Sequence, residues 1–478
     1  MTDCQSSVPL CVDLDGTVCR TDVLWESLVR LLRRNPLYLV RVLCWWLHGR
    51  AWLKQQIAAR TEVDLARLPY HQGFVDFLRA QRAQGRRLYL VTACDRRLAA
   101  AVAAHLGLFD EVLASDGQLN LRGPQKAARL VERFGRQGFD YAGNSRVDLL
   151  VWKQCRQAIV VNAGAGLAAR AAKCAPVSQV FPRPDSVSAA ALRALRPHQW
   201  VKNLILFVPL VTAHKITQPA LVLEAMWAFV AFSLCASGVY VLNDLLDLDA
   251  DRQHGAKRSR PFAAGALPLP AGLVAFPVLM AAGLALGWSL SRGFVATLGV
   301  YLVLATSYSW RLKQLPLLDV FCLAALYTIR LIAGHESTGV AYSFWLLVFS
   351  MFIFLSLALV KRYVELGAAR QENKSALEGR GYGAGDAELV AYLGTASGYL
   401  AVLVLALYVN SSEVVVLYQH PMRLLLICPL LLYWMSRVWL LAHRGQVHDD
   451  PIVFALKDPA SYVVGLLTLA AIWFATRP

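Results

Sequence analysis

The chain of 478 residues lacks several features that mark common protein classes. Its ten cysteines are scattered without a C-x-x-C pair, which argues against structural zinc and favours reduced thiols. The amino terminus is short, polar and soon acidic, so we expect no cleavable signal peptide. Acidic residues are few, with 32 Asp and Glu against 48 Lys and Arg. The net charge of +16 suits anionic lipid surfaces and phosphorylated substrates, and we expect no nucleic-acid partner because many basic residues flank apolar runs.

The first 180 or so residues lack any apolar run long enough to cross a membrane, whereas the remainder is dominated by such runs. A hydrophobic fraction of 57% and a mean hydropathy of +0.44 are too high for an ordinary soluble protein. We therefore predict a soluble domain over residues 1–167, a proline-containing linker over 168–192 and a membrane domain over 193–478.

An acidic stretch between two apolar runs organises the second part. Asn243, Asp247 and Asp251 fall on one helical face, with Asp244 beside them. A charge inside a bilayer costs about 2.5–3.5 kcal/mol, so we expect these residues at a helix end or in a wet cavity. Four oxygen side chains suit Mg²⁺, which shares its other positions with water and substrate phosphates. Three cations that phosphates require follow directly: Lys257, Arg258 and Arg260. The alternative interpretation is a solvated, mixed-charge loop.

We expect an all-α polytopic membrane domain of about nine transmembrane helices of about 20 residues each. They centre on 200–214, 222–242, 268–290, 293–309, 315–334, 341–360, 389–409, 421–442 and 460–476. Basic residues concentrate in one set of loops. The positive-inside rule places that set on the cytoplasmic side of the membrane, which we expect to be a bacterial inner or plasma membrane. Two spans separate the first domain from the acidic stretch, so we predict that both face the cytoplasm.

Other polar residues of the second part are candidates for binding phosphates. Asp319 and Arg330 share one face of a predicted span, and ionisable residues inside a membrane are functional candidates by default. We expect them to line one cavity, and the alternative is a buried pair that ties helices together. The remaining candidates lie at the ends of spans: Lys202, Asn203, Tyr308, Lys313, Lys361 and Arg362.

The first part carries motifs that alternate with helical patterns. A short apolar run ends in Asp13-Leu-Asp15-Gly-Thr, a second ends in Thr92, and Lys126 precedes a helical segment. Gly143-Asn144 and Asp148 come next, and a further apolar strand over Ala158–Val161 lies after them. Alternating strands and helices predict an α/β doubly wound domain with its site at the carboxyl ends of the strands.

This order of motifs resembles the haloacid dehalogenase-like (HAD) phosphohydrolases over residues 8–165. The resemblance implies that Asp13 is the nucleophile, that Asp15 is the general acid and base, and that Thr92 and Lys126 hold the phosphoryl group. It also implies Mg²⁺ ligands at Asp13, Asp15 and Asp148. The family motif has Asp where this chain has Asn144, which keeps an oxygen ligand but removes a charge. A degenerate domain kept for assembly or sensing is the alternative to an active phosphatase.

A helical insert over residues 22–75 is expected to form a cap above this site. Its tryptophans and arginines favour either contact with a membrane interface or simple packing on the core.

The second part resembles the UbiA superfamily of membrane prenyltransferases, through the acidic stretch Asn243–Asp251. A finer resemblance is to its decaprenyl-phosphate phosphoribosyltransferase branch. That likeness rests on Arg196–Asn203, Lys257–Gly265, Tyr308–Lys313, Lys361–Tyr363 and Ala455–Asp458. A second acid-rich motif, usual in aromatic prenyltransferases, is reduced here to Asp319.

The two resemblances together imply a bifunctional enzyme. The membrane domain would transfer 5-phosphoribose from phosphoribosyl pyrophosphate to a polyprenyl phosphate, with Mg²⁺ as cofactor and Asp244 and Asp247 as catalytic residues. The HAD domain would then remove the 5-phosphate. The alternatives are an aromatic prenyltransferase that uses a prenyl diphosphate, and a non-enzymatic membrane protein with a degenerate HAD domain. The sequence leaves the oligomeric state open.

Overall fold

The computed structural model describes residues 8–116, 120–184, 186–253, 255, 257–371, 376–377, 380–411, 414, 417–447 and 451–476. The chain divides into two compact units, which we describe separately. The first comprises Met1–Arg196 together with Tyr240–Pro277, and the second comprises Pro197–Val239 together with Val278–Pro478. The acidic stretch therefore belongs to the same compact unit as the amino-terminal domain.

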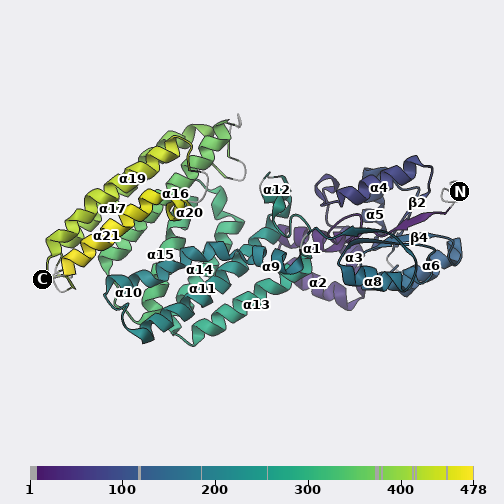
Figure 1. Cartoon of the computed structure of the whole chain (residues 1–478), viewed down its shortest axis with the longest axis horizontal. Coiled ribbons are helices and arrows are strands. Elements are labelled where there is room, and N and C mark those ends of the chain that lie inside the picture. The colour runs from purple at the N-terminus through teal and green to yellow at the C-terminus, as the bar shows by residue number, and fades with distance from the viewer. Residues whose placement is uncertain are drawn as a thin grey trace. The chain divides into compact units, whose positions relative to one another are not determined.

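A parallel sheet of six strands forms the centre of the first unit (Figure 1). Its order is β3-β2-β1-β4-β5-β6, and every neighbouring pair is parallel. The strands are β1 (Leu10–Val12), β2 (Leu88–Asp95), β3 (Glu111–Ser115), β4 (Asp140–Gly143), β5 (Ala158–Ala163) and β6 (Val177–Pro182). This topology confirms the predicted doubly wound α/β domain.

Helices cover both faces of the sheet (Figure 1). Leu10 and Val12 of β1 pack with α4 (Gln72–Ala83) and α5 (Arg96–Leu106). Cys11, between them, packs on the opposite face with residues of α6 (Pro124–Phe134), α7 (Leu149–Trp152) and α8 (Ala165–Ala172). Successive side chains of a strand point to opposite faces, and both faces here are apolar, as expected for buried parallel strands.

The predicted cap lies between β1 and α4. It consists of α1 (Val23–Arg34), α2 (Tyr38–Leu47), α3 (Arg50–Ala58) and the 3₁₀ turn η1 (Leu65–Arg67). Asp22 begins α1 as its N-cap, because its carboxylate accepts the backbone N–H of Leu24 at 2.9 Å. Leu28, Leu31 and Ile57 form a small core that joins α1 to α3.

Residues 168–192, where we expected a linker, contain regular structure. They include β6 and the start of α9 (Val187–Leu195). Most residues of β6 are exposed, so this edge strand lacks the apolar pattern that identifies a buried strand. The sheet therefore extends to Pro182, beyond the predicted end of the domain.

The remainder of the first unit holds the acidic stretch. α11 (Pro219–Leu246) ends within it, and α12 (Leu248–Gln253) and the 3₁₀ turn η4 (Lys257–Ser259) follow. α13 (Leu269–Trp288) then begins.

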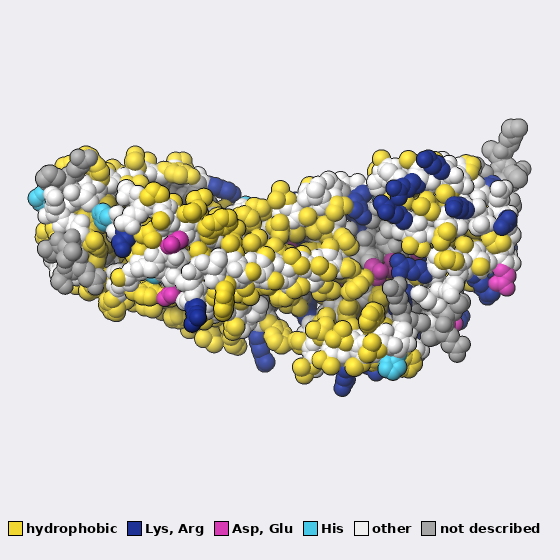
Figure 2. Space-filling model, turned by 90° about the horizontal axis from the view of Figure 1, so that it is seen from below, with side chains coloured by type: hydrophobic (Ala, Val, Ile, Leu, Met, Phe, Trp, Pro, Cys, Tyr) yellow, Lys and Arg dark blue, Asp and Glu magenta, His cyan; other side chains and the backbone are white. Residues whose placement is uncertain are grey.

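The second unit is a bundle of long apolar helices. Eight helices of the described chain are long and apolar enough to cross a membrane. They are α11, α13, α14 (Arg292–Trp310), α15 (Leu318–Thr338), α16 (Phe344–Gln371), α17 (Ala387–Val409), η7 with α19 (Pro421–His443) and α21 (Pro459–Thr476). On the face shown in Figure 2, hydrophobic side chains cover most of the bundle, which suits contact with lipid. The protein is an integral, multi-pass membrane protein.

The first of the nine predicted spans, over 200–214, is not a single long helix. The chain forms the 3₁₀ helix η3 (Pro197–Phe207) and the short α10 (Val208–Thr212). This segment is not among the eight described helices that are long and apolar enough to cross a membrane.

Candidate active sites

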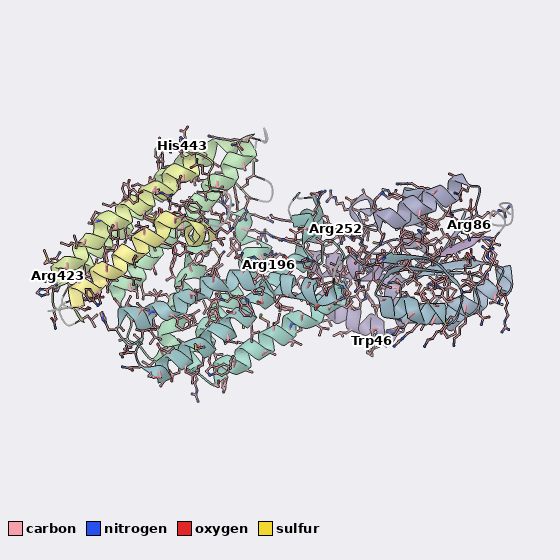
Figure 3. All side chains as sticks on the ribbon, in the orientation of Figure 1. Trp46, Arg86, Arg196, Arg252, Arg423 and His443 are labelled. Carbon is pink, nitrogen blue, oxygen red and sulfur yellow. The ribbon has the colours of Figure 1, made fainter. Side chains whose placement is uncertain are left out.

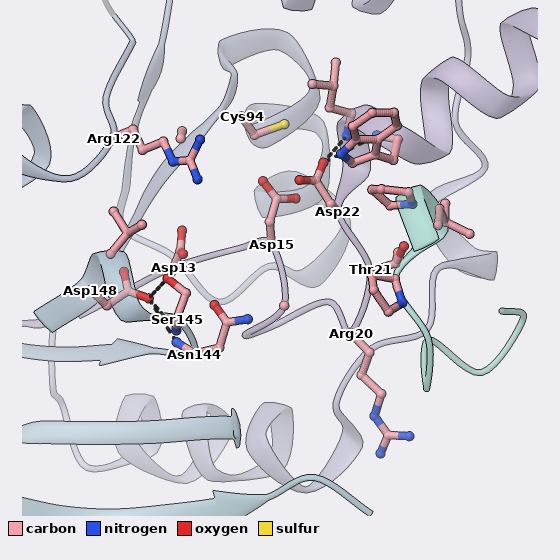
Figure 4. Close-up of a pocket in the computed structure, with 18 of the residues that line it drawn as sticks. Asp13, Asp15, Arg20, Thr21, Asp22, Cys94, Arg122, Asn144, Ser145 and Asp148 are labelled. Carbon is pink, nitrogen blue, oxygen red and sulfur yellow. Dashed lines mark hydrogen bonds between the residues drawn. The ribbon is translucent and has the colours of Figure 1, made fainter. Parts of the chain in front are cut away.

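A cavity of about 620 Å³ opens at the carboxyl ends of β1, β2 and β4 (Figure 4). Asp13 and Asp15 follow β1, and Asn144 and Asp148 follow β4. The strand order reverses between these two strands, and such a switch point is where doubly wound sheets bind their ligands. The fold therefore gathers the predicted phosphatase residues, apart from Thr92, on the wall of one cavity.

A chain of hydrogen bonds joins the two halves of this cavity. Lys126 donates from Nζ to Oδ1 of Asp13 at 2.9 Å and to the Tyr141 hydroxyl at 3.0 Å. The Tyr141 hydroxyl donates to Oδ1 of Asp148 at 3.0 Å. The other oxygen of Asp148 accepts from the backbone N–H and the hydroxyl of Ser145 at 2.9 and 2.8 Å. Both carboxylates are thus held in fixed orientations.

Burial in this cavity shifts the pKa values of both motif carboxyl groups upward. Burial raises the pKa of Asp13 to about 6, although the neighbouring Lys126 ammonium opposes this shift. Burial and the nearby carboxylates of Asp22 and Asp13 raise the pKa of Asp15 well above its usual range. The Lys126 ammonium therefore favours the ionised form of Asp13, whereas the carboxylates around Asp15 favour its protonated form.

Gly16 is a position where the backbone requires glycine. Its φ of +76° lies in the left-handed region, and a Cβ there would lie 1.9 Å from the side-chain nitrogen Nδ2 of Asn144. Asn144 itself lines the cavity, at the place where the family motif has Asp.

Thr92 is fully buried and does not line the cavity; its hydroxyl accepts the N–H of Cys94 at 3.0 Å. Its assignment as a phosphoryl ligand stays a prediction.

Other lining residues were not identified from the sequence. Lys54 of α3 donates to the carbonyl of Ala93 at 2.5 Å and to Oδ1 of Asn120 at 3.0 Å, and burial lowers its pKa. It follows no motif, and the only signal was a single Lys in the cap. The cavity is further lined by Arg20, Asp22, Trp25, Trp46, Cys94, Arg122, Arg183, Gly265, Pro268, Leu269 and Pro270.

The acidic stretch of this unit keeps the predicted helical spacing. The N–H of Asp247 donates to the carbonyl of Asn243 at 2.9 Å, and that of Asp251 to Asp247 at 2.8 Å. The i, i+4, i+8 pattern therefore continues across the junction between α11 and α12. The residues lie at a helix end, as expected from the cost of placing carboxylates within a bilayer.

Arginines occupy part of this stretch. Asp244, which is 1% exposed, pairs with Arg196 and, at 3.2 Å, with Arg260. Arg260 also donates to both oxygens of Asp251, at 2.9 and 2.7 Å. Arg260 was predicted to bind phosphate, whereas in the structure it neutralises the acidic stretch.

Both acidic sites suit Mg²⁺ held jointly with a phosphate. Among the described residues, no three His, Cys, Asp or Glu side chains are close enough to hold a metal by themselves. Mg²⁺ usually takes only one or two carboxylates and keeps water and phosphate as its other ligands. In the acidic stretch, Oδ2 of Asp244 is buried without a hydrogen-bond partner. In the sheet domain, the nearby carboxylate of Asp148 contributes to the raised pKa of Asp13, an effect that a bound cation would relieve.

Buried ion pairs connect the cap to the acidic stretch. Arg252 of α12, labelled in Figure 3, donates to both oxygens of Glu26 of α1, at 3.1 and 2.5 Å. The side chains of Glu26 and Arg252 are 0% and 6% exposed. Arg30, one turn further along α1, pairs with Asp249 of α12. None of these pairs was predicted, because the partners lie more than 200 residues apart in the sequence.

In the bundle, Asp319 is a buried structural ion-pair partner. It pairs with Arg362 at 2.5 Å and accepts the Tyr382 hydroxyl at 2.6 Å, and neither Asp319 nor Arg362 is exposed. Arg330, predicted to share a cavity with Asp319, makes other contacts. Its Nε donates to Asn203 at 2.8 Å, and its guanidinium lies 5.3 Å from each of three rings: Phe232, Tyr301 and Tyr327. The alternative interpretation, in which a buried pair ties helices together, therefore describes Asp319, with Arg362 as its partner.

The remaining candidates of the membrane domain differ in burial. Lys202 is buried and its ammonium lies 5.8 Å from the centre of the Tyr327 ring. The Tyr308 hydroxyl accepts from Arg380 at 2.7 Å. Lys257 and Arg258 are exposed, and Lys313 and Lys361 are partly buried. Their roles stay predictions.

Comparison with known families agrees with the two folds. The model of the UbiA prenyltransferase family matches residues 204–457. The chain belongs to the UbiA prenyltransferase family. The model of haloacid dehalogenase-like hydrolases matches residues 10–151, so this family member carries a HAD-like domain at its amino terminus.

Several curated relatives share this organisation or part of it. A protein of Sinorhizobium fredii, y4nM, is 39% identical over 98% of this chain and 91% of its own length. The nodulation protein NoeC of Azorhizobium caulinodans is 37% identical over 56% of this chain and 88% of its own. Decaprenyl-phosphate phosphoribosyltransferase of Mycobacterium tuberculosis is 36% identical over 39% of this chain and 64% of its own.

Among solved structures, a UbiA homologue from Archaeoglobus fulgidus bound to GPP and Mg²⁺ covers 60% of this chain and 98% of its own. Its identity is 17% and its TM-score 0.46.

Proposed function

We propose that this UbiA family member transfers 5-phosphoribose from phosphoribosyl pyrophosphate to a polyprenyl phosphate, and that its HAD domain removes the 5-phosphate from the product. The observation that carries the proposal is the shared first unit. Helix α12 of the acidic stretch is ion-paired to the cap, and the residues that line the phosphatase cavity include four that follow a short distance later: Gly265, Pro268, Leu269 and Pro270. Two reactions in sequence would use such an arrangement, because the site of hydrolysis would lie near the product of the transfer step.

For the transfer step, Asn243, Asp244, Asp247 and Asp251 would hold Mg²⁺, which supplies charge neutralisation to the departing diphosphate. The acceptor is already an anion, so the transfer requires no strong base. We assign binding of the sugar and lipid phosphates to the other basic residues of the membrane domain: Lys202, Lys257, Arg258, Arg260, Lys313 and Lys361. Arg260 would exchange its carboxylate partners for phosphate when substrate arrives.

For the hydrolytic step, Asp13 would attack the phosphorus of the 5-phosphate, and the ribose oxygen would leave with the proton of Asp15. Water, deprotonated by Asp15, would then release inorganic phosphate from the aspartyl phosphate. Lys126 would neutralise the transferred group, and Asp13, Asn144 and Asp148 would hold Mg²⁺. The raised pKa of Asp15 supports its role as the acid.

Two findings support the branch assignment: the partial relatives that are decaprenyl-phosphate phosphoribosyltransferases, and the environment of Asp319. An aromatic prenyltransferase that binds a prenyl diphosphate through a second acidic motif would need that carboxylate free. Arg362 neutralises Asp319 within the bundle. We further propose that both sites face the cytoplasm, in agreement with the basic loops.

The test is a reaction in detergent with phosphoribosyl pyrophosphate, Mg²⁺ and a polyprenyl phosphate, followed by mass spectrometry of the lipid product. We expect lipid-linked ribose without 5-phosphate from the wild type, the phosphorylated lipid from Asp13→Asn, and no sugar-lipid from Asp247→Asn. Asp76→Asn, an exposed change on α4, is the control. A wild-type product that keeps its phosphate would refute the role of the HAD domain, and the absence of any sugar-lipid would refute the transferase.

A further inference from the structure

The cap helix α2 has no buried residue, although it is mostly apolar. Its inner face, Tyr38, Val42 and Trp45, packs partly on the small core of the cap. Its outer face and ends expose six large hydrophobic side chains, between 55% and 78%: Leu37, Leu39, Val40, Leu43, Trp46 and Leu47. An ordinary cap helix in water would present polar residues on its outer side.

Two observations indicate what covers this outer face. Trp46, at the end of α2, lines the same cavity as Leu269 and Pro270. Leu269 is the first residue of α13, a candidate membrane span of mean hydropathy 2.1. Within this unit, the end of α2 thus lies beside the point where a span begins.

The charges around α2 match an anionic lipid surface. Arg33 and Arg34, before the helix, and Arg41, within it, are exposed, and the described part of α2 carries no acidic residue. A helix with one apolar side, an exposed Trp and flanking arginines is typical of segments that lie at the boundary between headgroups and acyl chains. Trp46 appears at the outer edge of the cap helices in Figure 3.

We propose that α2 lies in the membrane leaflet with Leu39, Leu43 and Leu47 among the acyl chains, so that the phosphatase cavity opens at the lipid surface. The substrate class that suits such a cavity is a phosphomonoester carried by a lipid. This second statement rests on the proposed function, whereas the position of α2 does not.

The position is measured with a nitroxide on Cys44, an exposed thiol of α2. Cys4, Cys174 and Cys428 are replaced by Ser, and the full chain is reconstituted in liposomes that contain anionic lipid. We expect the label to be more accessible to oxygen than to a water-soluble nickel chelate. A label at Arg79→Cys on α4, an exposed site of the same domain, should show the opposite order. A label at Cys44 that favours nickel would overturn the proposal, as would spin–spin broadening that shows a second copy of the chain on this face.

A double variant, Leu43→Glu with Leu47→Glu, separates the two statements. Both side chains are exposed, so the fold of the cap should survive. We expect the Cys44 label to shift from oxygen to nickel accessibility. We also expect kcat/KM to fall for a lipid-borne phosphomonoester in liposomes and to stay unchanged for p-nitrophenyl phosphate. An unchanged label would refute the insertion of α2, and equal losses on both substrates would refute entry from the lipid surface. Absence of all phosphatase activity in the wild type would refute the proposed function and leave the depth measurement valid.

Discussion

Glu26→Gln tests whether the cap depends on the acidic stretch. Glu26 and Arg252 are buried together, and Arg252 also donates to the carbonyl of Ala263 at 3.0 Å. The substitution keeps the shape of the side chain and removes its charge. Arg252 is then left as a buried cation without its main counter-ion.

Breaking a buried ion pair by removing one partner costs about 3–5 kcal/mol. We expect the lower end, about 3 kcal/mol, because the amide oxygen of Gln can still accept a hydrogen bond from Arg252. Since each 1.4 kcal/mol is a factor of ten, local opening of α12 should become roughly 100-fold more frequent.

Hydrogen–deuterium exchange measures this opening directly. Amides of Leu248–Gln253 and of α1 should exchange roughly 100-fold faster in Glu26→Gln, while those of β5 should not change. Glu132→Gln is the matched control, because its partner Arg129 and Glu132 itself are 52% and 68% exposed. Such exposed pairs contribute about 0–1 kcal/mol.

A second substitution examines the reason for the effect. Adding Arg252→Met to Glu26→Gln removes the uncompensated charge, so it should restore much of the protection in α12. If Glu26→Gln leaves exchange in α12 unaltered, the ion pair does not hold the cap to the acidic stretch.

Two further predictions concern the cavity of the sheet domain, and a third concerns the Asp319–Arg362 pair in the bundle. Because burial raises the pKa of Asp13 to about 6, the rate of p-nitrophenyl phosphate hydrolysis at low Mg²⁺ should fall about tenfold per pH unit below 6, as the nucleophile gains a proton. More Mg²⁺ should move this fall in rate to lower pH. A rate that does not depend on pH from 4 to 7 would contradict the expectation. Asn144→Asp restores the carboxylate of the family motif, so the Mg²⁺ concentration that gives half-maximal hydrolysis should fall several-fold in a metal titration. An unchanged or raised concentration would count against Asn144 as a ligand. Arg362→Met leaves Asp319 buried without its main counter-ion, so it should lower the free energy of unfolding in detergent by about 3–5 kcal/mol. Adding Asp319→Leu should restore stability. Full stability of the single variant would show that the pair is not structural.

The sequence predicted the parts of the fold that depend on local pattern. Apolar strands that end in Asp13 and Thr92 identify buried parallel strands, and their alternation with helices determines the sheet class. The long apolar runs identified the spans from 222 onward. In contrast, β6 is an exposed edge strand without period-two burial, and η3 is a 3₁₀ helix, which no hydropathy window distinguishes from an α-helix.

The predicted site residues differ in how far local pattern could reach. Asp13, Asp15, Lys126, Asn144 and Asp148 were found because their order along the chain resembles the motifs of the HAD family. The partners of charged residues were not, since ion pairs depend on contacts across hundreds of residues. Arg260 follows the acidic stretch closely, yet only the three-dimensional structure shows that it turns back onto Asp244 and Asp251.

The buried contact between Glu26 and Arg252 has a consequence for dividing the protein. A fragment that ends at Arg196 would contain every strand of the sheet but would leave the Glu26 carboxylate without Arg252. Such a fragment would expose a surface that the intact chain keeps covered. A HAD-like fragment made for study would therefore need residues 240–277, which belong to the same compact unit, supplied in trans, or a redesigned surface on α1.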